Sequence, residues 1–431
     1  MRIPHLRVLR ARASVALSTA VLVSAAGCSK APPQTAVDVS GELPAEGGEP
    51  PTGAEGAAPG GPGMSPEAAS AYAAGMSAFQ SGDLKGAGEQ FSKAISVDRR
   101  AYPAHVALAV VQERRGEMAR ALESYAAALA VAPDFGPAIA GRVRLLLSMG
   151  RAGEAETFVR GLSARYPDSA AVLAALAEVM SARGDSTSAQ ELAQKALKKD
   201  PDYRPAMVAL ARDHYRARRL DLALYTLTAI LDGYGDENPP RDKNNADARL
   251  LRALIFKEQG KRKAAIEEFG AVVGLRPDLV EPRLHLAVYM LEAGNAAEAR
   301  PLLEEALKYE PSSLLVHLNL GDAYRLLGKP KDALDHLNWV SRKDASLPQT
   351  HYNLGLVYLF STGVPGLNEE QAINRAIESF ERFKKLEPRA ARGSGDDVDE
   401  LIARAKNKKA IIEAMKEQPA APADGETGDQ G

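Results

Sequence analysis

Residues 320–333 read LGDAYRLLGKPKDA and place a small residue, a turn glycine and an alanine at fixed distances, as Gly321, Gly328 and Ala333. The spacing recurs at a constant interval, and the turn glycine is seen again at Gly82, Gly116, Gly150 and Gly184. The alanine position holds Ala87, Ala121, Ala155, Ala189 and Ala223, resumes after an interruption with Ala265, Ala299 and Ala333, and occurs once more at Ala376. A fixed period of about 34 residues is typical of arrays in which each repeat is one supersecondary unit. The sequence therefore predicts a stack of about nine repeats.

The residue types at these positions predict that each repeat is a pair of antiparallel helices. Helices cross closely where both carry small side chains, so we expect the small position of the first helix to face the alanine of the second. Glycine permits the left-handed turn between the helices. Proline ends most repeats, because it cannot continue a helix. The content of 45% hydrophobic but only 5% aromatic residues fits an all-α fold packed through Ala and Leu.

This pattern resembles the tetratricopeptide repeat. The resemblance covers roughly residues 68–390 and is clearest at Leu320, Gly321, Asp322, Ala323, Tyr324, Gly328 and Ala333, and at Asn353, Leu354, Gly355, Tyr358, Ala376, Phe380 and Pro388. It is weaker where Val143 fills the small position and where Arg218 replaces the turn glycine. The resemblance implies a right-handed solenoid of about nine repeats, with the first helix of each repeat lining a concave face.

Two other segments organise the array. Residues 232–245 (DGYGDENPPRDKNN) interrupt the period with turn-forming residues, so we expect a hinge between repeats 1–5 (67–235) and repeats 6–9 (236–390). Residues 391–417 are predicted to form a capping helix, because a solenoid needs a closing element with a polar outer side. Its apolar face would consist of Val398, Leu401, Ile402, Ala405, Ile412 and Met415. Residues 418–431 are predicted to be disordered.

The N-terminal 27 residues have the pattern of an export signal. Four arginines precede an apolar run from Ala13 to Ala26, which is shorter than the roughly 20 residues of a membrane-spanning helix. The run ends in Ser24, Ala25, Ala26, Gly27 and Cys28, which resembles the lipobox of bacterial lipoproteins. The resemblance implies that the Cys28 thiol receives diacylglycerol and that the mature N-terminus carries three acyl chains. The alternative is an ordinary signal peptide with Cys28 as a free thiol.

The residues after Cys28 predict where and how the repeats are held. Ser29 follows the cysteine, and by the same resemblance this favours an outer-membrane lipoprotein that faces the periplasm. Residues 28–66 contain eight Pro and eight Gly and are predicted to form a disordered tether. Without the first 27 residues the net charge would be -6, and it comes from acidic residues outside the repeats, so the near-neutral array gives no electrostatic argument for binding nucleic acid.

The sequence contains none of the patterns that carry catalysis or metal binding. There is no phosphate-binding glycine loop, His-Glu-x-x-His motif, nucleophile-elbow serine or pair of cysteines, since Cys28 is the only cysteine. His317 and His351 share one repeat position, where we expect core packing rather than metal ligation. We therefore expect no enzyme activity, cofactor, metal or small-molecule substrate.

A candidate peptide-binding groove lies on the first helices of repeats 6–9. His285, Asn319 and Asn353 are one repeat period apart, and the resemblance implies that such asparagines bind the backbone of an extended peptide. The alternative is that they only follow the family consensus. The other candidates are Leu254, Val288, Leu356, Asp322 and Arg325. The apolar members could instead be used in packing between first helices. Repeats 1–5 offer a more mixed surface, with Arg144, Glu178 and Arg212.

The functional expectation follows from the repeats and the N-terminus together. The chain resembles tetratricopeptide lipoproteins of gliding-motility, pilus-assembly and secretion complexes, and the gliding-motility kind most closely. The resemblance implies a lipid-anchored scaffold that binds other envelope proteins. The alternatives are a pilotin-type assembly chaperone for a pilus or secretion complex, and an activator of a peptidoglycan enzyme.

Overall fold

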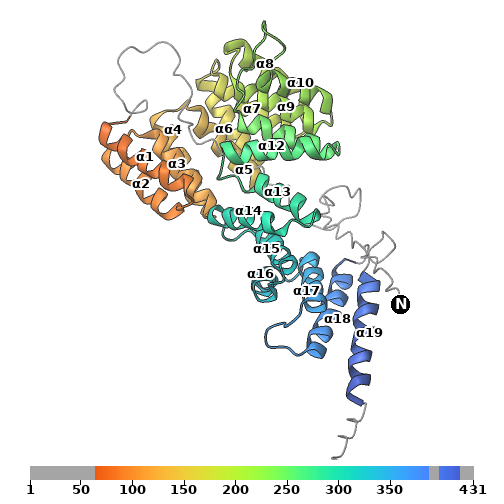
Figure 1. The fold of residues 1–431 in the computed structure, drawn as a ribbon. Coiled ribbons are helices and arrows are strands. Elements are labelled where there is room, and N and C mark those ends of the chain that lie inside the picture. Colours follow the sequence, from red (N-terminus) through yellow and green to blue (C-terminus); the bar gives the residue numbers. More distant parts are fainter. Residues whose placement is uncertain (1–63, 388–397, 418–431) are drawn as a thin grey trace, which may run out of the picture. The chain divides into compact units, whose positions relative to one another are not determined.

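The computed structural model describes residues 64–387 and 398–417, and within these residues every regular element is an α-helix (Figure 1). Nine consecutive helix pairs occupy the first of these ranges, as the repeat period predicted, and a nineteenth helix occupies the second. The pairs are α1 (Pro66–Gln80) and α2 (Leu84–Val97), α3 (Tyr102–Arg114) and α4 (Met118–Val131), α5 (Gly136–Ser148) and α6 (Ala152–Arg165), α7 (Ala170–Ala182) and α8 (Ser186–Lys199), α9 (Arg204–Arg216) and α10 (Leu220–Leu231), α11 (Ala246–Glu258) and α12 (Arg262–Leu275), α13 (Val280–Glu292) and α14 (Ala296–Tyr309), α15 (Leu314–Leu326) and α16 (Pro330–Lys343), and α17 (Pro348–Phe360) and α18 (Glu369–Leu386).

Several sequence predictions fall outside the described residues. These are the signal peptide, lipidation at Cys28, almost all of the tether, and the tail at 418–431. None of the described helices is long and apolar enough to cross a membrane.

Helix boundaries follow the local chemistry of the sequence. The Ser65 hydroxyl accepts a hydrogen bond of 3.3 Å from the Ala68 N–H at the start of α1. Asn368 and Gln371 form a reciprocal capping box at the start of α18. Between the helices of a pair, the turn glycines have φ between 68° and 85°, as at Gly328 and Gly184. At the equivalent turn of repeat 5, Arg218 takes the left-handed conformation with φ of 60°.

The small position of the first helix faces a larger side chain than we expected. A Cβ added to Gly75, Gly321 or Gly355 would lie 2.5–2.6 Å from the side chains of Phe91, Leu337 and Phe380 respectively. These residues follow the repeat alanine by one helical turn. In these three repeats the ring or leucine fills the space that the missing Cβ leaves, and the expected contact with alanine stays a prediction.

The described residues divide into two compact units. Unit 1 comprises residues 64–292 and 305–311, and unit 2 comprises residues 293–304, 312–387 and 398–417. The division falls within α14, whereas the sequence suggested a hinge at residues 232–245. Helices on both sides of that insertion belong to unit 1.

The insertion is folded against repeat 5. Its backbone is closed by a 2.7 Å hydrogen bond from the Tyr234 N–H to the Asn238 carbonyl. Arg241 donates to the Pro201 carbonyl at 3.1 Å and to Asp202 at 2.8 Å. The Tyr234 ring stacks on Tyr225 with centroids 5.0 Å apart. These contacts hold the insertion on the start of α9 and on α10.

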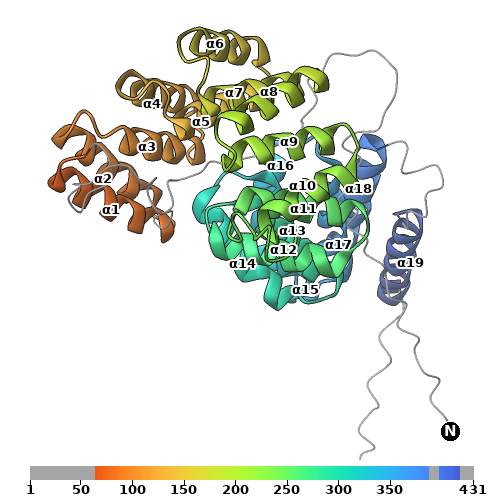
Figure 2. The same cartoon turned by 90° about the horizontal axis from the view of Figure 1, so that it is seen from above.

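Each unit has its own core. In unit 1, first helices such as α3 and α7 are buried along almost their whole circumference, and Figure 2 shows α7 beside the first helix of the next repeat, α9. In unit 2, α19 (Val398–Glu417) packs Val398, Leu401, Ile402 and Ala405 against the last repeat. The predicted capping helix is thus confirmed over residues 398–417, while 391–397 lie outside the described residues. Met415, which was predicted to lie on the apolar face, is 69% exposed instead, because the packed part of the helix ends before it.

Candidate protein-binding surfaces

The residues predicted for the groove lie on the first helices of repeats 6–9, but they are divided between the two units. Leu254 is in α11, and His285 and Val288 are in α13, all in unit 1. Unit 2 holds the remaining residues, namely Asn319, Asp322 and Arg325 in α15 and Asn353 and Leu356 in α17.

The polar residues of the unit 2 set are buried. Asn319 and Asp322 are each 3% exposed, and Asn353 is also buried. The Asn319 amide donates a 2.8 Å hydrogen bond to the Leu315 carbonyl of its own helix. Asp322 accepts hydrogen bonds from Arg325 at 2.8 and 2.6 Å. An incoming peptide would have to compete with these intrahelical bonds, so peptide binding by these side chains stays a prediction.

The unit 1 set is more open at its histidine. The His285 side chain is partly exposed, with Nε2 3.6 Å from the Glu281 carboxylate and Nδ1 3.4 Å from Lys257 Nζ. Its ring lies 4.7 Å from that of Phe269. Burial lowers the pKa of Lys257, although the nearby Glu281 opposes this shift. His285 is therefore a groove candidate with polar neighbours and with side-chain surface that still reaches solvent.

The apolar members of the groove are used largely in packing. Val288, Leu356 and the neighbouring Leu250 and Leu318 are buried, while Leu254 is half-buried. Burial of this kind matches the packing alternative that the sequence left open. It leaves little apolar surface for a ligand in the absence of rearrangement.

The charged residues of repeats 1–5 pair with one another across successive first helices. Arg144 binds Glu113 through two nitrogens at 2.8 and 2.9 Å, and Glu113 also accepts a hydrogen bond from the Tyr125 hydroxyl. Glu178 binds Arg212 at 3.1 Å and Arg216 at 2.7 Å. Burial alone would raise the pKa of Glu178, but the two guanidiniums outweigh it and lower the pKa to about 2. These ion pairs join neighbouring repeats.

The sequence contains a signal for this pairing, although it was interpreted above only as a mixed surface on repeats 1–5. Arg144, Glu178 and Arg212 occupy the same repeat position and alternate in charge. In adjacent first helices, opposite charges at one position can meet, as Glu178 and Arg212 do.

The most exposed aromatic group lies at the insertion, which the sequence analysis did not propose for binding. Tyr225 is 64% exposed, and Leu222 and Tyr234 are also exposed. Tyr225 and Tyr234 line a depression of about 480 Å³ together with Pro239, Pro240 and Arg241. We call Leu222, Tyr225 and Tyr234 the insertion patch.

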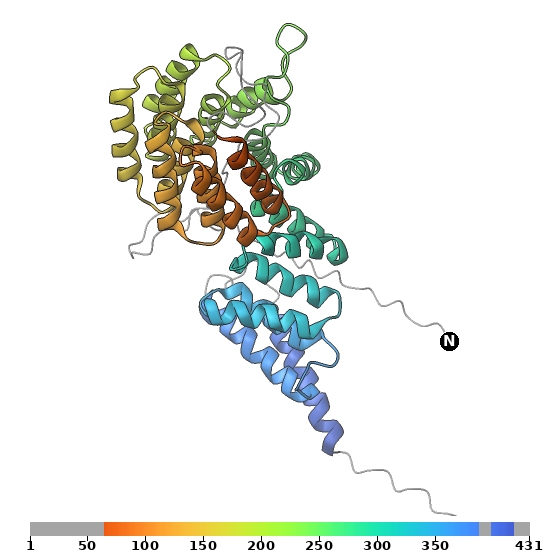
Figure 3. The ribbon, with the colours of Figure 1, turned by 90° about the vertical axis from the view of Figure 1, so that its left-hand side faces the viewer.

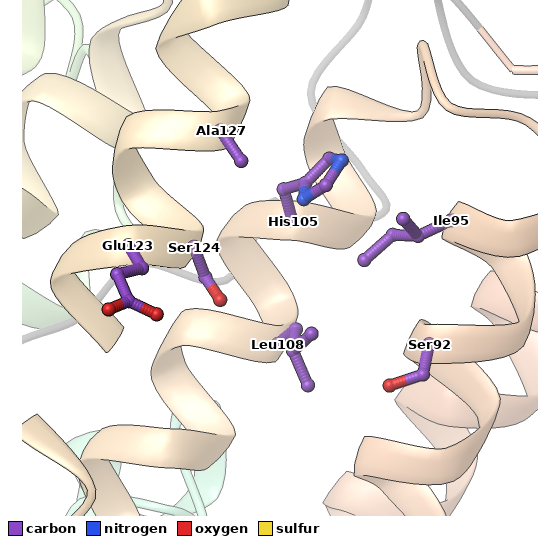
Figure 4. Close-up of a pocket in the computed structure, with 7 residues that line it drawn as sticks. All are labelled: Ser92, Ile95, His105, Leu108, Glu123, Ser124 and Ala127. Carbon is purple, nitrogen blue, oxygen red and sulfur yellow. The ribbon is translucent and has the colours of Figure 1, made fainter. Parts of the chain in front are cut away.

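A second depression, of about 300 Å³, lies between α2, α3 and α4 (Figure 4). Its wall contains His105, Glu123 and Ser124, and the Ser124 hydroxyl donates to the Gln112 side chain at 2.7 Å. Burial lowers the pKa of His105. In the residues that the structure covers, no group of three or more His, Cys, Asp or Glu side chains could hold a metal ion.

Comparison with known proteins identifies the repeats. Three family models described as tetratricopeptide repeat match the chain, and together they cover more than half of it, at residues 72–137, 114–179, 181–242, 246–279 and 290–351. The chain is also similar to a chain in the crystal structure of the APC/C hetero-tetramer Cut9-Hcn1, at 16% identity and a TM-score of 0.48 over 78% of this chain and 76% of that one. A further similar structure is the P58(IPK) TPR domain, at 17% identity and a TM-score of 0.24 over 74% of this chain and 99% of that one.

The family assignment rests on the repeat matches and on the helix pairs themselves. Tetratricopeptide folds are typically scaffolds for protein interaction rather than catalytic domains. The helix pairs and matched repeats agree along repeats 1–8, each with a turn glycine except repeat 5, where Arg218 takes its place, and the first helix of the ninth pair follows at the same spacing. The chain therefore belongs to the tetratricopeptide-repeat family.

Proposed function

We propose that the protein is a lipid-anchored scaffold of the bacterial cell envelope, held at the outer membrane with its repeats in the periplasm, where it binds partner proteins. The observation that carries the binding role is the set of large apolar side chains that the repeats and the capping helix leave exposed. Tyr225 in unit 1 and Ile411 and Met415 in unit 2 are 60–69% exposed. Contiguous exposed apolar surface on a folded protein is typical of interaction sites.

The anchor is supported by the sequence around Cys28. Three acyl chains would hold the protein firmly, since each buried methylene contributes about 0.8 kcal/mol. We expect Cys28→Ser to move the protein from the membrane fraction to the soluble periplasmic fraction and to abolish incorporation of a labelled fatty acid. Continued membrane fractionation of Cys28→Ser would contradict lipidation.

The binding surface can be located with matched variants. Tyr225→Ser removes an exposed aromatic ring from the insertion patch, and His285→Ala removes a partly exposed side chain of the predicted groove. Cross-linking and affinity capture from membranes would compare the envelope proteins recovered by each variant with those recovered by the unaltered protein. Loss with Tyr225→Ser alone assigns binding to the insertion patch, and loss with His285→Ala alone assigns it to the groove. Unchanged recovery with both variants would contradict binding through either surface.

The resemblance favours the gliding-motility complex as the assembly to which the protein belongs. In a gliding host, deletion of the gene is then expected to abolish surface translocation, and capture is expected to recover several envelope proteins. Recovery of one secretin or outer-membrane barrel protein, with translocation intact, would support the assembly-chaperone alternative instead.

A further inference from the structure

Repeat 1 contacts the end of α14 within unit 1, although Tyr309 lies 229 positions after Gln80. The rings of Phe79 and Tyr309 meet edge to face with centroids 5.9 Å apart, and both are buried. The Tyr309 hydroxyl donates a 2.8 Å hydrogen bond to the Gln80 carbonyl. A Cβ added to the turn glycine Gly82 would lie 2.8 Å from Lys308 Cβ. Figure 3 shows the orange N-terminal helices beside the teal segment that contains residues 305–311.

A group of charged side chains extends this contact to repeat 2. Arg114, at the end of α3, binds Asp278 at 3.0 Å and Glu310 at 3.4 Å. Arg276 binds the same Asp278 carboxylate through nitrogens at 2.8 and 2.7 Å. We call Arg114, Arg276, Asp278 and Glu310 the closing cluster. It connects the second repeat with the loop before α13 and with the residue after α14.

The closing cluster is buried at its centre. The side chains of Arg114 and Asp278 are each 2% exposed. Burial alone would raise the pKa of Asp278, but the guanidiniums of Arg276 and Arg114 outweigh it and lower the pKa. A buried charge is strongly destabilising when its partner is removed. Arg114 is therefore compatible with this burial because Asp278 and Glu310 lie against it.

Such a contact is unusual for a solenoid. In repeat arrays each repeat ordinarily contacts only its neighbours, so stability is nearly a sum of local terms. Here a residue of repeat 2 pairs with residues 164 and 196 positions away. The inner positions of α3, including Ala107, Val110 and Val111, are buried as well.

We propose that unit 1 closes on itself through the closing cluster and the Phe79–Tyr309 contact, and that this closure makes repeat 1 and residues 305–311 open together instead of separately. The closure is built from side chains of this chain alone. It does not depend on the lipid anchor or on which partner is bound.

Hydrogen exchange of the full-length protein tests the closure. Arg114→Met removes the charge but keeps an apolar chain. We expect exchange to rise at least about tenfold, equivalent to 1.4 kcal/mol of opening free energy, in α1 and in residues 305–311 together. The matched control is Arg212→Met, which breaks an ion pair between adjacent repeats. In Arg212→Met, exchange should rise only in α7, α9 and their paired helices.

Two outcomes would overturn the closure. One is exchange in Arg114→Met that rises in α3 and its neighbours while residues 305–311 remain as in the unaltered protein. The other concerns Tyr309→Ala, which also serves if Arg114→Met does not fold and which removes the ring against Phe79 without leaving a charge unpaired. Exchange should again rise in α1 and in residues 305–311 together. A rise at only one of the two places in a folded Tyr309→Ala variant would contradict the proposal.

Discussion

Unit 1 and unit 2 are built from the same repeat but end their arrays differently. In unit 1, residues 305–311 cover repeat 1 through Phe79 and Tyr309, and a buried ion pair joins Arg114 to Asp278. In unit 2, the additional helix α19 covers repeat 9 with Val398 and Ala405. A terminal repeat has one apolar face without a neighbour. The comparison shows that this face can be covered either by a distant part of the same array or by an added helix.

The buried charges of the two units also differ in what they connect. In unit 1, Arg144 and Arg212 bind carboxylates of the preceding repeat, and Arg114 binds one much further along the chain. In unit 2, the buried Asp322 is paired with Arg325 of its own helix. Ion pairs in unit 1 therefore couple repeats, whereas this pair in unit 2 stabilises a single helix.

Truncating the same core position in each unit should give the largest effect. Phe91→Ala in repeat 1 and Phe380→Ala in repeat 9 each remove a fully buried ring that fills the space beside a glycine. We expect each to cost about 3–5 kcal/mol of unfolding free energy, measured by denaturant titration. Hydrogen exchange should separate them, because Phe91→Ala should also speed exchange in residues 305–311. Phe380→Ala should act on α17, α18 and α19 only. If faster exchange extended equally far from the substitution in both variants, the distinction between the units would be removed.

The second-largest effect should be the loss of stability of unit 1 in acid. The pKa of Glu178 lies at about 2 instead of an ordinary 4.5, so its stabilising contribution is complete above about pH 4.5 and is lost as pH falls toward 2. The lowered pKa of Asp278 acts in the same direction. Glu310 opposes them, since burial raises its pKa and its ionised form is costly at neutral pH. Exchange measured between pH 6 and 3, corrected for intrinsic rates, should increase in α7 and α9 more than in α15. The variant Glu178→Gln should be less stable at pH 6 and should lose less stability over this range.

The repeat fold could be predicted because it depends on neighbours in sequence. Gly328, Ala333 and their equivalents recur once in each repeat, and the turn and core contacts they make lie within one repeat or the next. The apolar face of residues 398–405 likewise indicated a cap. Arg114 gave no such signal, because its partner is 164 residues away and the repeat period compares only adjacent repeats.

The predicted groove shows a second reason why a sequence pattern does not fully predict a binding site. The spacing of His285, Asn319 and Asn353 correctly places them on successive first helices. It does not say whether the side chains reach solvent, which depends on how closely neighbouring helices pack. Asn319 is buried and bonded to Leu315 of its own helix, while His285 remains partly exposed. The charged position shared by Glu178 and Arg212 was visible in the sequence, but their pairing required the structure.

The hydroxyl of Tyr309 should make a smaller contribution to closure than the ion pairs. Tyr309→Phe keeps the ring against Phe79 and removes the hydrogen bond to the Gln80 carbonyl, which should cost about 0.5–1.5 kcal/mol. Exchange should rise in α1 and in residues 305–311, with α17 and α18 unchanged. A suitable control is Tyr352→Phe in unit 2, whose ring contacts Phe380 and Phe383. If Tyr309→Phe leaves exchange in α1 unaltered, the hydroxyl contributes nothing to the contact.

The smallest expected effect concerns the turn of repeat 5 in unit 1. Arg218 has φ of 60°, a conformation that costs a residue with a Cβ roughly 1 kcal/mol and glycine almost nothing. Arg218→Gly should relieve this cost but lose the ion pair with Glu258, which contributes little because the Arg218 side chain is 68% exposed. We therefore expect the free energy of unfolding, measured by heat or denaturant, to rise by up to about 0.5 kcal/mol.

The reverse test is Gly150→Ala, where φ is 72° and a Cβ would meet nothing within 4 Å. It should lose about 1 kcal/mol through backbone conformation alone. If Arg218→Gly were instead clearly destabilising, the Glu258 pair between repeats 5 and 6 would be stronger than its exposure indicates. Coupling between repeats in unit 1 would then extend to its surface ion pairs as well as its buried ones.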